Sequence, residues 1–543
     1  MRRLSALLPV VAIAGASLVV MGQPAAAAPG VPRDPVAVFA EDFENGQGAT
    51  PVLVDAYTGA PPVSQTYTAD PAWLTACNGY LAARQQVTAP SGCAASLWPT
   101  MRNLAAALGQ FAGADPEANH AVTAYTAGNP GANKTELRSL APIPLATGNR
   151  FLTFGVDTAA ISCQVAHPLL QFYLLDGVTR VPTFSSAIDP CNQYDTTIGG
   201  ARVGRAESDA PVLFAGSAVG LELVNAQGSG TGNDFALDKV RLLDVTPALD
   251  LVATASPVPV GSTATLTFTV TNTTELAVKN GWSFTAALPA GLTATAPATT
   301  DCAGTVAGLT VTGSLTAGQV SCSVTIPVTA ATAGTYRTCV PTVLGLDAPA
   351  CAAVRFVPPA YVFDAHAYGA KVITVGPLGA SDVTCSAAPA TDTDALLDTP
   401  VPTGTLGVLT TSASGVEDAL GRRTASASAR TTGVSLLSGL ITADLIEATA
   451  VTASSGTGAV TATGTATIGA LRVAGVPVVN PPPNLAITIP LVASVVVNEQ
   501  VPYGTGIRVN ALHVRLLTGV DIVISSARSA LTPPGGTCPG GGS

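Results

Sequence analysis

The stretch GSTATLTFTVTN, residues 261–272, alternates apolar and hydroxyl-bearing side chains without interruption. Its apolar positions are Ala264, Leu266, Phe268 and Val270, and threonines occupy the positions between them. A period of two residues is that of an extended strand whose two faces meet different surroundings. We therefore expect a half-buried antiparallel strand here, and an all-β fold wherever the pattern recurs.

The same alternation recurs along most of the chain, and the composition agrees with it. Of the 543 residues, 47% are hydrophobic and only 11% are charged, with 54 glycines and 42 prolines. Disordered chains carry more charge and fewer β-branched residues, whereas β-sandwiches have this composition. The exception is TMRNLAAALGQFA, residues 100–112, where Leu104, Leu108 and Phe111 recur at helical spacing and predict a single helix.

A chain of this length exceeds what one hydrophobic core accommodates. We expect three β-sandwich-type domains in series, and their predicted ranges are 36–247, 248–357 and 360–531. A glycine-rich tail, residues 532–543, follows them and carries one cysteine.

Residues 1–27 have the three-part pattern of a secretory signal peptide. Arg2 and Arg3 precede an apolar run, and small residues that end at Ala27 form a cleavage site. The alternative, a transmembrane anchor, is disfavoured because Pro9 and Gly15 interrupt the run. We expect a secreted chain that makes no membrane insertion after cleavage of the signal.

The charge excludes two classes of partner. The formal net charge is −10, and the four lysines, Lys134, Lys239, Lys279 and Lys371, form no basic cluster. Nucleic acids and anionic membrane surfaces need concentrated positive charge, so we expect neither as a partner.

The ten cysteines fall into groups of even size, one group per predicted domain. The groups are Cys77, Cys93, Cys163 and Cys191; Cys302, Cys322, Cys339 and Cys351; and Cys385 and Cys538. Even groups predict disulfides within each domain of an exported protein. Short loops close most easily, which favours pairs 77–93, 163–191, 302–322 and 339–351, although each group of four allows three pairings. A Cys385–Cys538 bond would tie the tail to the start of the third domain.

The first domain opens with FAEDFENG, residues 39–46, and closes with GTGNDFALDKVRLLDV, residues 230–245. These segments resemble the first and last strands of secreted jelly-roll domains of the lectin-like sort, in which the terminal strands lie side by side. The resemblance implies a structural calcium ion, and its candidate ligands are Glu41, Glu44, Asp234 and Asp238. Carboxylates suit calcium, but the same residues also read as solvated acids at strand ends.

The second domain combines the opening alternating strand with NGWSFTAALPAGLT, residues 280–293. The run from Leu288 to Leu292, LPAGL, resembles the immunoglobulin-like (Ig-like) repeat modules of bacterial surface proteins, which act as spacers. Trp282 is the one tryptophan of this domain, and we expect it in the core rather than at a ligand.

The third domain carries four separated blocks, AHAYGAKV (365–372), GLITADLIEATAV (439–451), VVNPPPNLAITIPLVASVVVNEQ (478–500) and RVNALHVRLLTGVDIVISSA (508–527). In this order they resemble the actinobacterial choice-of-anchor P proteins, which are exported and envelope-associated and bring no established activity. The family carries cysteine where this chain has Val451 and Arg528. No anchor motif follows Cys538, so we expect the chain to be released or held noncovalently.

Ionisable residues are too scattered to predict an enzyme. The four histidines, His120, His167, His366 and His513, form no metal-spaced pair, and no serine-hydrolase motif occurs. Glycoside hydrolysis, the weakest alternative, needs two carboxylates that face one bond, and EDFE, residues 41–44, has the wrong spacing for this. We expect no catalytic activity and no cofactor beyond the calcium ion.

Two function classes remain. The first is a secreted, envelope-associated structural or adhesive protein that contacts cell-wall or extracellular glycan or other surface proteins. The second is a carbohydrate-binding protein that acts through the first domain. Its candidate glycan contacts, in or beside the Cys77–Cys93 loop, are Trp73, Tyr80 and Trp98, which could equally pin that loop to its own core.

Overall fold

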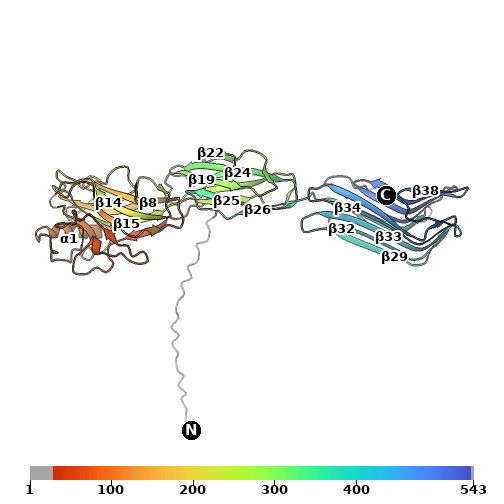
Figure 1. Cartoon of the computed structure of the whole chain (residues 1–543), viewed down its shortest axis with the longest axis horizontal. Helices are drawn as coiled ribbons and strands as arrows, with labels where there is room; N and C mark the ends of the chain where they lie inside the picture. The colour runs from red at the N-terminus through yellow and green to blue at the C-terminus, as the bar shows by residue number, and fades with distance from the viewer. Residues whose placement is uncertain (1–27, 127–128, 373–374, 540–543) are drawn as a thin grey trace, which may run out of the picture.

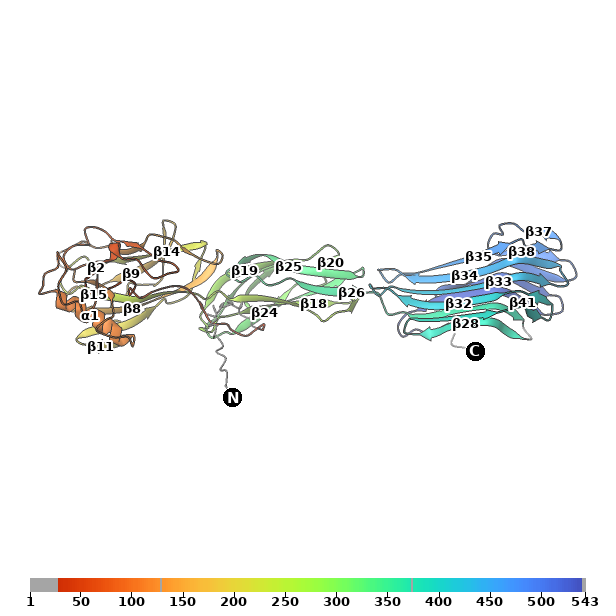
Figure 2. The same cartoon turned by 90° about the horizontal axis from the view of Figure 1, so that it is seen from below.

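The computed structural model describes residues 28–126, 129–372 and 375–539, so the expected signal peptide, residues 1–27, lies outside the described residues. The chain is an all-β, multi-domain protein. Three pairs of sheets follow one another along the chain and lie end to end in an elongated rod (Figure 1, Figure 2). We call them unit 1, unit 2 and unit 3. None of the described helices is long and apolar enough to span a bilayer.

Unit 1 pairs a nine-stranded sheet with a six-stranded sheet. The nine-stranded sheet comprises β1 (Val36–Glu41), β2 (Val52–Leu53), β4 (Tyr80–Ala82), β5 (Ala121–Ala124), β8 (Arg150–Ile161), β11 (Thr196–Ile198), β12 (Ala201–Glu207), β13 (Val212–Phe214) and β15 (Asp234–Asp244). The six-stranded sheet comprises β3 (Tyr67–Thr68), β6 (Lys134–Ser139), β7 (Ile143–Pro144), β9 (Leu170–Asp176), β10 (Thr179–Pro182) and β14 (Ala218–Asn225). A short 3-10 helix, η1 (Val54–Ala56), follows β2.

The terminal strands of unit 1 lie side by side, as expected, with β1 antiparallel to β15 from Val36 opposite Asp244 to Glu41 opposite Val240. Aromatic side chains from both sheets meet between them, and the ring centroids of Phe154 and Phe172 lie 4.8 Å apart. The expected helix is confirmed as α1 (Trp98–Phe111), with Pro99 in its first turn. Proline fits this position because its missing N–H has no partner within a helix.

Unit 2 pairs a five-stranded sheet with a six-stranded sheet. The first comprises β16 (Ala248–Ala253), β18 (Ala264–Thr271), β20 (Leu292–Ala294), β21 (Thr299–Thr300) and β24 (Ser321–Ala330). The second comprises β17 (Val258–Pro259), β19 (Lys279–Ala287), β22 (Ala303–Ala307), β23 (Thr310–Leu315), β25 (Gly334–Leu344) and β26 (Ala352–Val357). The alternating stretch is strand β18, whose apolar positions are buried in the core together with Trp282.

Unit 3 pairs a six-stranded sheet with a nine-stranded sheet. The six-stranded sheet comprises β27 (Val362–Val372), β28 (Gly376–Ser386), β38 (Leu485–Ile489), β39 (Ala493–Tyr503), β40 (Gly506–Leu516) and β41 (Asp521–Thr532). The nine-stranded sheet comprises β29 (Ala390–Leu396), β30 (Thr399–Val401), β31 (Gly404–Leu406), β32 (Leu409–Glu417), β33 (Arg423–Leu436), β34 (Ile441–Ser454), β35 (Val460–Gly469), β36 (Arg472–Val473) and β37 (Val476–Pro477). Alanine, valine, leucine and isoleucine dominate its core.

A partly buried ion-pair network joins unit 1 to unit 2. Arg150, at the start of β8, donates from Nε to Oδ2 of Asp244 at 2.7 Å and also binds Asp347 of unit 2. Asp347 binds Arg33 as well, and Arg33 donates to the carbonyl oxygen of Thr246 at 2.9 Å. The side chains of Arg150 and Asp244 are each only 8% exposed. Because every charge has an opposite partner, the junction is held by directional bonds.

The junction between unit 2 and unit 3 rests on hydrogen bonds to backbone carbonyl oxygens of unit 3. The amide of Ala333 donates to the carbonyl oxygen of Gly456 at 2.6 Å, and Arg355 donates to that of Ala419 at 2.6 Å. Both acceptors belong to turns at one end of unit 3. The other end of unit 3 is therefore the far end of the rod (Figure 2).

Candidate functional site

The four acids expected to hold calcium do not converge. Among the described residues, no three of these carboxylates come within the reach of one ion. Glu41 turns inward and accepts hydrogen bonds at 2.9 Å from the hydroxyls of Tyr57 and Tyr67. Glu44 accepts from the backbone of His120 at 2.6 Å and lies 2.7 Å from its ring Nδ1. Both carboxylates are thus committed to protein partners, and the geometry supplies no shared oxygen cage for calcium.

Asp234 and Asp238 lie on β15 and are also buried. The Asn119 amide donates to Asp238 at 2.9 Å, whereas one oxygen of Asp234 has no partner in the described structure. Burial raises the pKa of each carboxyl group to about 7. A buried carboxyl group is more stable protonated, so these residues titrate near neutrality.

The prediction that three aromatic residues contact glycan is corrected by the burial of two of them. Trp73 is 0% exposed and Trp98 is 1% exposed, so neither offers a ring face to a ligand. The Trp98 indole donates to the carbonyl oxygen of Gln86 at 2.6 Å, and the hydroxyl of Tyr80 donates to that of Ser91 at 2.9 Å. The rings of Tyr80 and Trp98 meet edge to face at 6.0 Å. These three aromatic residues therefore fix the Cys77–Cys93 loop to the core of unit 1. This is the second of the two roles that the sequence allowed for them.

Four of the five expected disulfides form, and they join Cys77 to Cys93, Cys163 to Cys191, Cys302 to Cys322 and Cys339 to Cys351. The fifth expectation is corrected, because Cys385 and Cys538 are thiols here. Partial desolvation and the neighbouring Cys538 side chain raise the pKa of Cys385 to about 11, so at neutral pH this exposed thiol is protonated.

Two other groupings in the described chain bring three metal-capable side chains together. They are His167, Asp189 and Cys191, and Asp301, Cys302 and Cys322. All three cysteines belong to disulfides, which leaves no thiolate to bind a metal.

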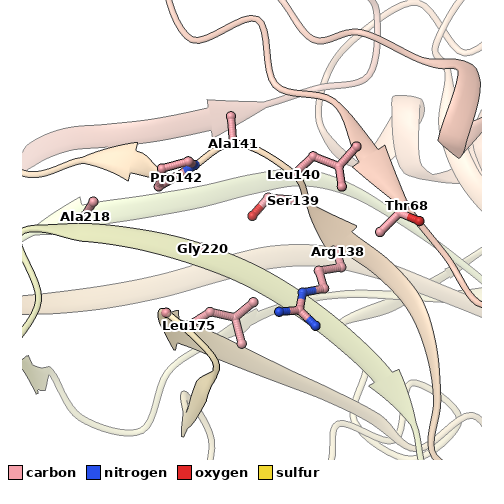
Figure 3. A pocket seen from close by; sticks show the side chains of 10 residues that line it. Thr68, Arg138, Ser139, Leu140, Ala141, Pro142, Leu175, Ala218 and Gly220 are labelled. Atoms are coloured by element: carbon pink, nitrogen blue, oxygen red, sulfur yellow. The ribbon is translucent and has the colours of Figure 1, made fainter.

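The hollow on unit 1 is the site that the sequence did not indicate. It has a volume of about 510 Å³ and lies on the outer face of the six-stranded sheet, over β3, β6, β9 and β14 (Figure 3). Arg138 of β6 points into it, and Gly220 of β14 forms part of the lining (Figure 3). A Cβ atom on Gly220 would lie 3.2 Å from Leu175 and 3.3 Å from the hydroxyl of Ser139, so glycine keeps this surface open.

A fixed polar network borders the hollow. Glu222, opposite Arg138 across the strand pair, accepts from Arg180 at 2.5 and 2.8 Å and from Thr135 at 2.8 Å. Arg180 also lies over the ring of Tyr173, 5.3 Å from its centroid. Burial alone would raise the pKa of Glu222, but the bonds from Arg180 and Thr135 hold it below its ordinary value. Arg138, in contrast, forms no ion pair within the described chain.

The four histidines stay apart, and each lies near a carboxylate. His513 is the most constrained, with Nδ1 at 2.7 Å from Glu499 and Nε2 at 2.5 Å from Asp521. Only a doubly protonated imidazole can donate to both carboxylates. His366 lies 3.6 Å from Asp382 on β28. The reason is register, because Asp382 is the cross-strand neighbour of His366.

Comparison with known proteins characterises one segment. Residues 247–345 match a family model described as a domain of unknown function (DUF7933), which covers most of unit 2. No curated protein matches the chain. A solved structure from Bacteroides ovatus, described as a structural-genomics protein of unknown function, is similar over 54% of this chain and 96% of that one, at 9% identity and a TM-score of 0.16. This similarity is too weak to carry any argument about function.

Proposed function

We propose that the chain is a secreted, envelope-associated structural or adhesive protein without catalytic activity. The observation that carries the proposal is the end-to-end arrangement of three two-sheet units (Figure 1), with an ion-pair network across the first junction. Two-sheet units in series are a means of spanning distance, since most of each core lies within its own pair of sheets, with Phe151 of unit 1 packed into the core of unit 2. Four disulfides support an oxidising, extracellular location.

The finer assignments of the units belong to the same proposal. Unit 2 serves as an Ig-like spacer, which its two facing sheets and its LPAGL turn support. Unit 3 corresponds to a choice-of-anchor P domain, supported by four sequence blocks that all contribute strands to one pair of sheets. Unit 1 is the jelly-roll-like head, supported by its paired terminal strands.

The far end of unit 3 supports contact with the envelope. Turns at this end and the short strand β37 expose large aliphatic side chains, namely Leu397 (74%), Val476 (64%), Val479 (78%), Leu491 (93%) and Leu517 (72%). Exposed apolar clusters of this kind mark interaction sites. We infer that the rod engages its partner, another component of the cell surface, through this end.

Binding of the purified full chain to isolated envelopes of the producing cells tests the proposal. Replacing both Leu491 and Leu517 by serine should weaken binding roughly tenfold or more, because each buried leucine contributes about 1.5–3 kcal/mol. The matched control replaces Val165 and Val178 of unit 1, which are 93% and 90% exposed, by serine and should change nothing. Equal binding by the two variants would refute engagement through unit 3.

A second candidate function is carbohydrate binding at the hollow on unit 1. Arg138, without an ion-pair partner in the described chain, beside the hydroxyls of Thr68 and Ser139, favours it. A glycan array probed with the full chain should show binding that Arg138→Ala removes and Arg337→Ala, an exposed arginine of unit 2, retains. A blank array would eliminate this candidate. Release of reducing sugar, abolished by Glu222→Gln, would instead establish the glycoside hydrolase alternative.

A further inference from the structure

Two arginines face each other on the outer surface of the six-stranded sheet of unit 3. Arg508 on β40 is the direct cross-strand neighbour of Arg528 on β41. Directly opposed side chains in an antiparallel pair have Cβ atoms only about 4.5–5.5 Å apart. The alternate residues Val509 and Ala527 are buried in the core, so both arginines point away from it. Two like charges thus stand side by side on the outer face of this sheet.

An aromatic ring holds both guanidinium groups in place. The guanidinium carbons of Arg508 and Arg528 lie 5.1 Å and 4.9 Å from the centroid of the Tyr503 ring. Tyr503 is itself fixed, because its hydroxyl donates to Asp364 at 2.8 Å. Stacking on a ring orders a guanidinium group and leaves its edge N–H groups available. The pair is therefore preorganised.

Neither arginine is neutralised by a carboxylate in the described chain. No Asp or Glu oxygen described lies within 4.0 Å of either guanidinium group, and the buried Nε of Arg528 has no hydrogen-bond partner there. His366, the cross-strand neighbour of Arg528 on β27, has a buried Nδ1 that lies 3.6 Å from Asp382, beyond hydrogen-bond distance. A buried donor without an acceptor costs free energy of folding. An acceptor supplied by a bound ligand would remove this cost.

The nearby acids are engaged elsewhere. Glu499 and Asp521 hold His513, whereas Asp382 accepts from the hydroxyl of Thr384 and lies 3.6 Å from Nδ1 of His366. Asp364, below Tyr503, keeps one oxygen without a partner and is the carboxylate placed to compete for the arginines. The two arginines thus have carboxylates in their surroundings, but none of these carboxylates forms an ion pair with either guanidinium group.

We propose that Arg508 and Arg528, stacked on Tyr503 and flanked by His366, bind a phosphate or sulfate group of a larger molecule. Each guanidinium fork can hold two oxygens, and two forks offer more donors than the two oxygens of a carboxylate can use. A tetrahedral oxyanion has enough oxygens to face both forks. This proposal does not depend on the proposed envelope association. It would make unit 3 specific for partners that carry a phosphate or sulfate group.

The titration of His366 can report anion binding in the unmodified chain. Burial is the largest factor that lowers its pKa, and the charge of Arg528 lowers it further, whereas Asp382 and Asp364 oppose this shift. An anion bound between the arginines would offset the charge of Arg528. The titration of the His366 ring, followed by NMR and assigned with His366→Gln, should therefore move to higher pH in phosphate relative to chloride at equal ionic strength.

Calorimetry on the full chain tests the site with inorganic phosphate, sulfate and acetate as probes. Phosphate and sulfate should bind and acetate should not. Arg508→Ala and Arg528→Ala should each weaken binding by roughly tenfold, since each removes a charge-assisted pair of hydrogen bonds. Arg528→Lys keeps the charge but loses the fork and should fall between. Arg430→Ala, an exposed arginine of unit 3, is the matched control and should have no effect.

Asp364→Asn extends the test in the opposite direction. It removes the competing charge but keeps an acceptor for the Tyr503 hydroxyl, so phosphate should bind more tightly. The proposal is overturned if none of the three anions binds, if acetate binds as well as phosphate, or if binding survives the loss of both arginines. An unmoved His366 titration in phosphate would also overturn it, and that measurement needs no change to the arginines.

Discussion

Replacing Arg150 by methionine would remove the cation at the centre of the junction between units 1 and 2. Methionine keeps the apolar stem, so the change isolates the guanidinium group. Asp244, whose side chain is 8% exposed, would lose two bonds of 2.7 and 2.6 Å and keep only the backbone amide of Thr246 as a donor. Leaving a buried charge without its partner costs about 3–5 kcal/mol. We expect the free energy of unfolding to fall by an amount in this range.

Tryptophan fluorescence during urea unfolding measures this loss where it occurs. The three tryptophans are Trp73 and Trp98 in unit 1 and Trp282 in unit 2, so unit 3 is silent. Arg337→Met, at an exposed arginine of unit 2, is the matched control and should lie within about 0.5 kcal/mol of the unmodified chain. In small-angle scattering, Arg150→Met should broaden the distribution of interatomic distances, because the units then pivot. If Arg150→Met unfolds and scatters like the control, the network does not hold the junction.

Three further predictions follow from the buried and paired groups. Peptide mapping without reductant after mild oxidation should recover Cys385 joined to Cys538, because the two side chains are neighbours, and two separate free cysteines would contradict this. The native state keeps a proton on Asp238 between pH 3.8 and about 7, so stability from this group is complete below 3.8 and is lost as pH rises through 7. Asp238→Asn should therefore reduce the fall in unfolding free energy across that window by up to about 1.4 kcal/mol per pH unit, and an unchanged pH profile would refute the assignment. A chelator should leave the melting temperature unchanged if Glu41, Glu44, Asp234 and Asp238 hold no ion, whereas a drop would restore the calcium hypothesis.

Local pattern predicted the elements of this fold well. The alternation around Phe268 identified a strand with one buried face, and the spacing of Leu104, Leu108 and Phe111 identified the helix. Both signals depend on residues only a few positions apart, which local periodicity encodes directly. The four formed disulfides were also predictable, because each closes a short loop.

The sites were less predictable, because they depend on register between strands that are distant in sequence. Trp98 looked like a surface aromatic beside a loop, but the first turn of α1 places it in the core. Glu41 and Glu44 are close in sequence, yet one turns toward two tyrosines and the other toward His120. Arg508 and Arg528 become neighbours only once β40 pairs with β41. Only the alternation of each strand signalled which side chains face outward.

The measurement that tests the central claim most directly is the fractionation of the producing cells into culture medium, envelope released by urea, and envelope that resists urea. A structural or adhesive rod held noncovalently through its own surfaces should appear mainly in the envelope fraction that urea releases. A chain found entirely in the culture medium would contradict envelope association.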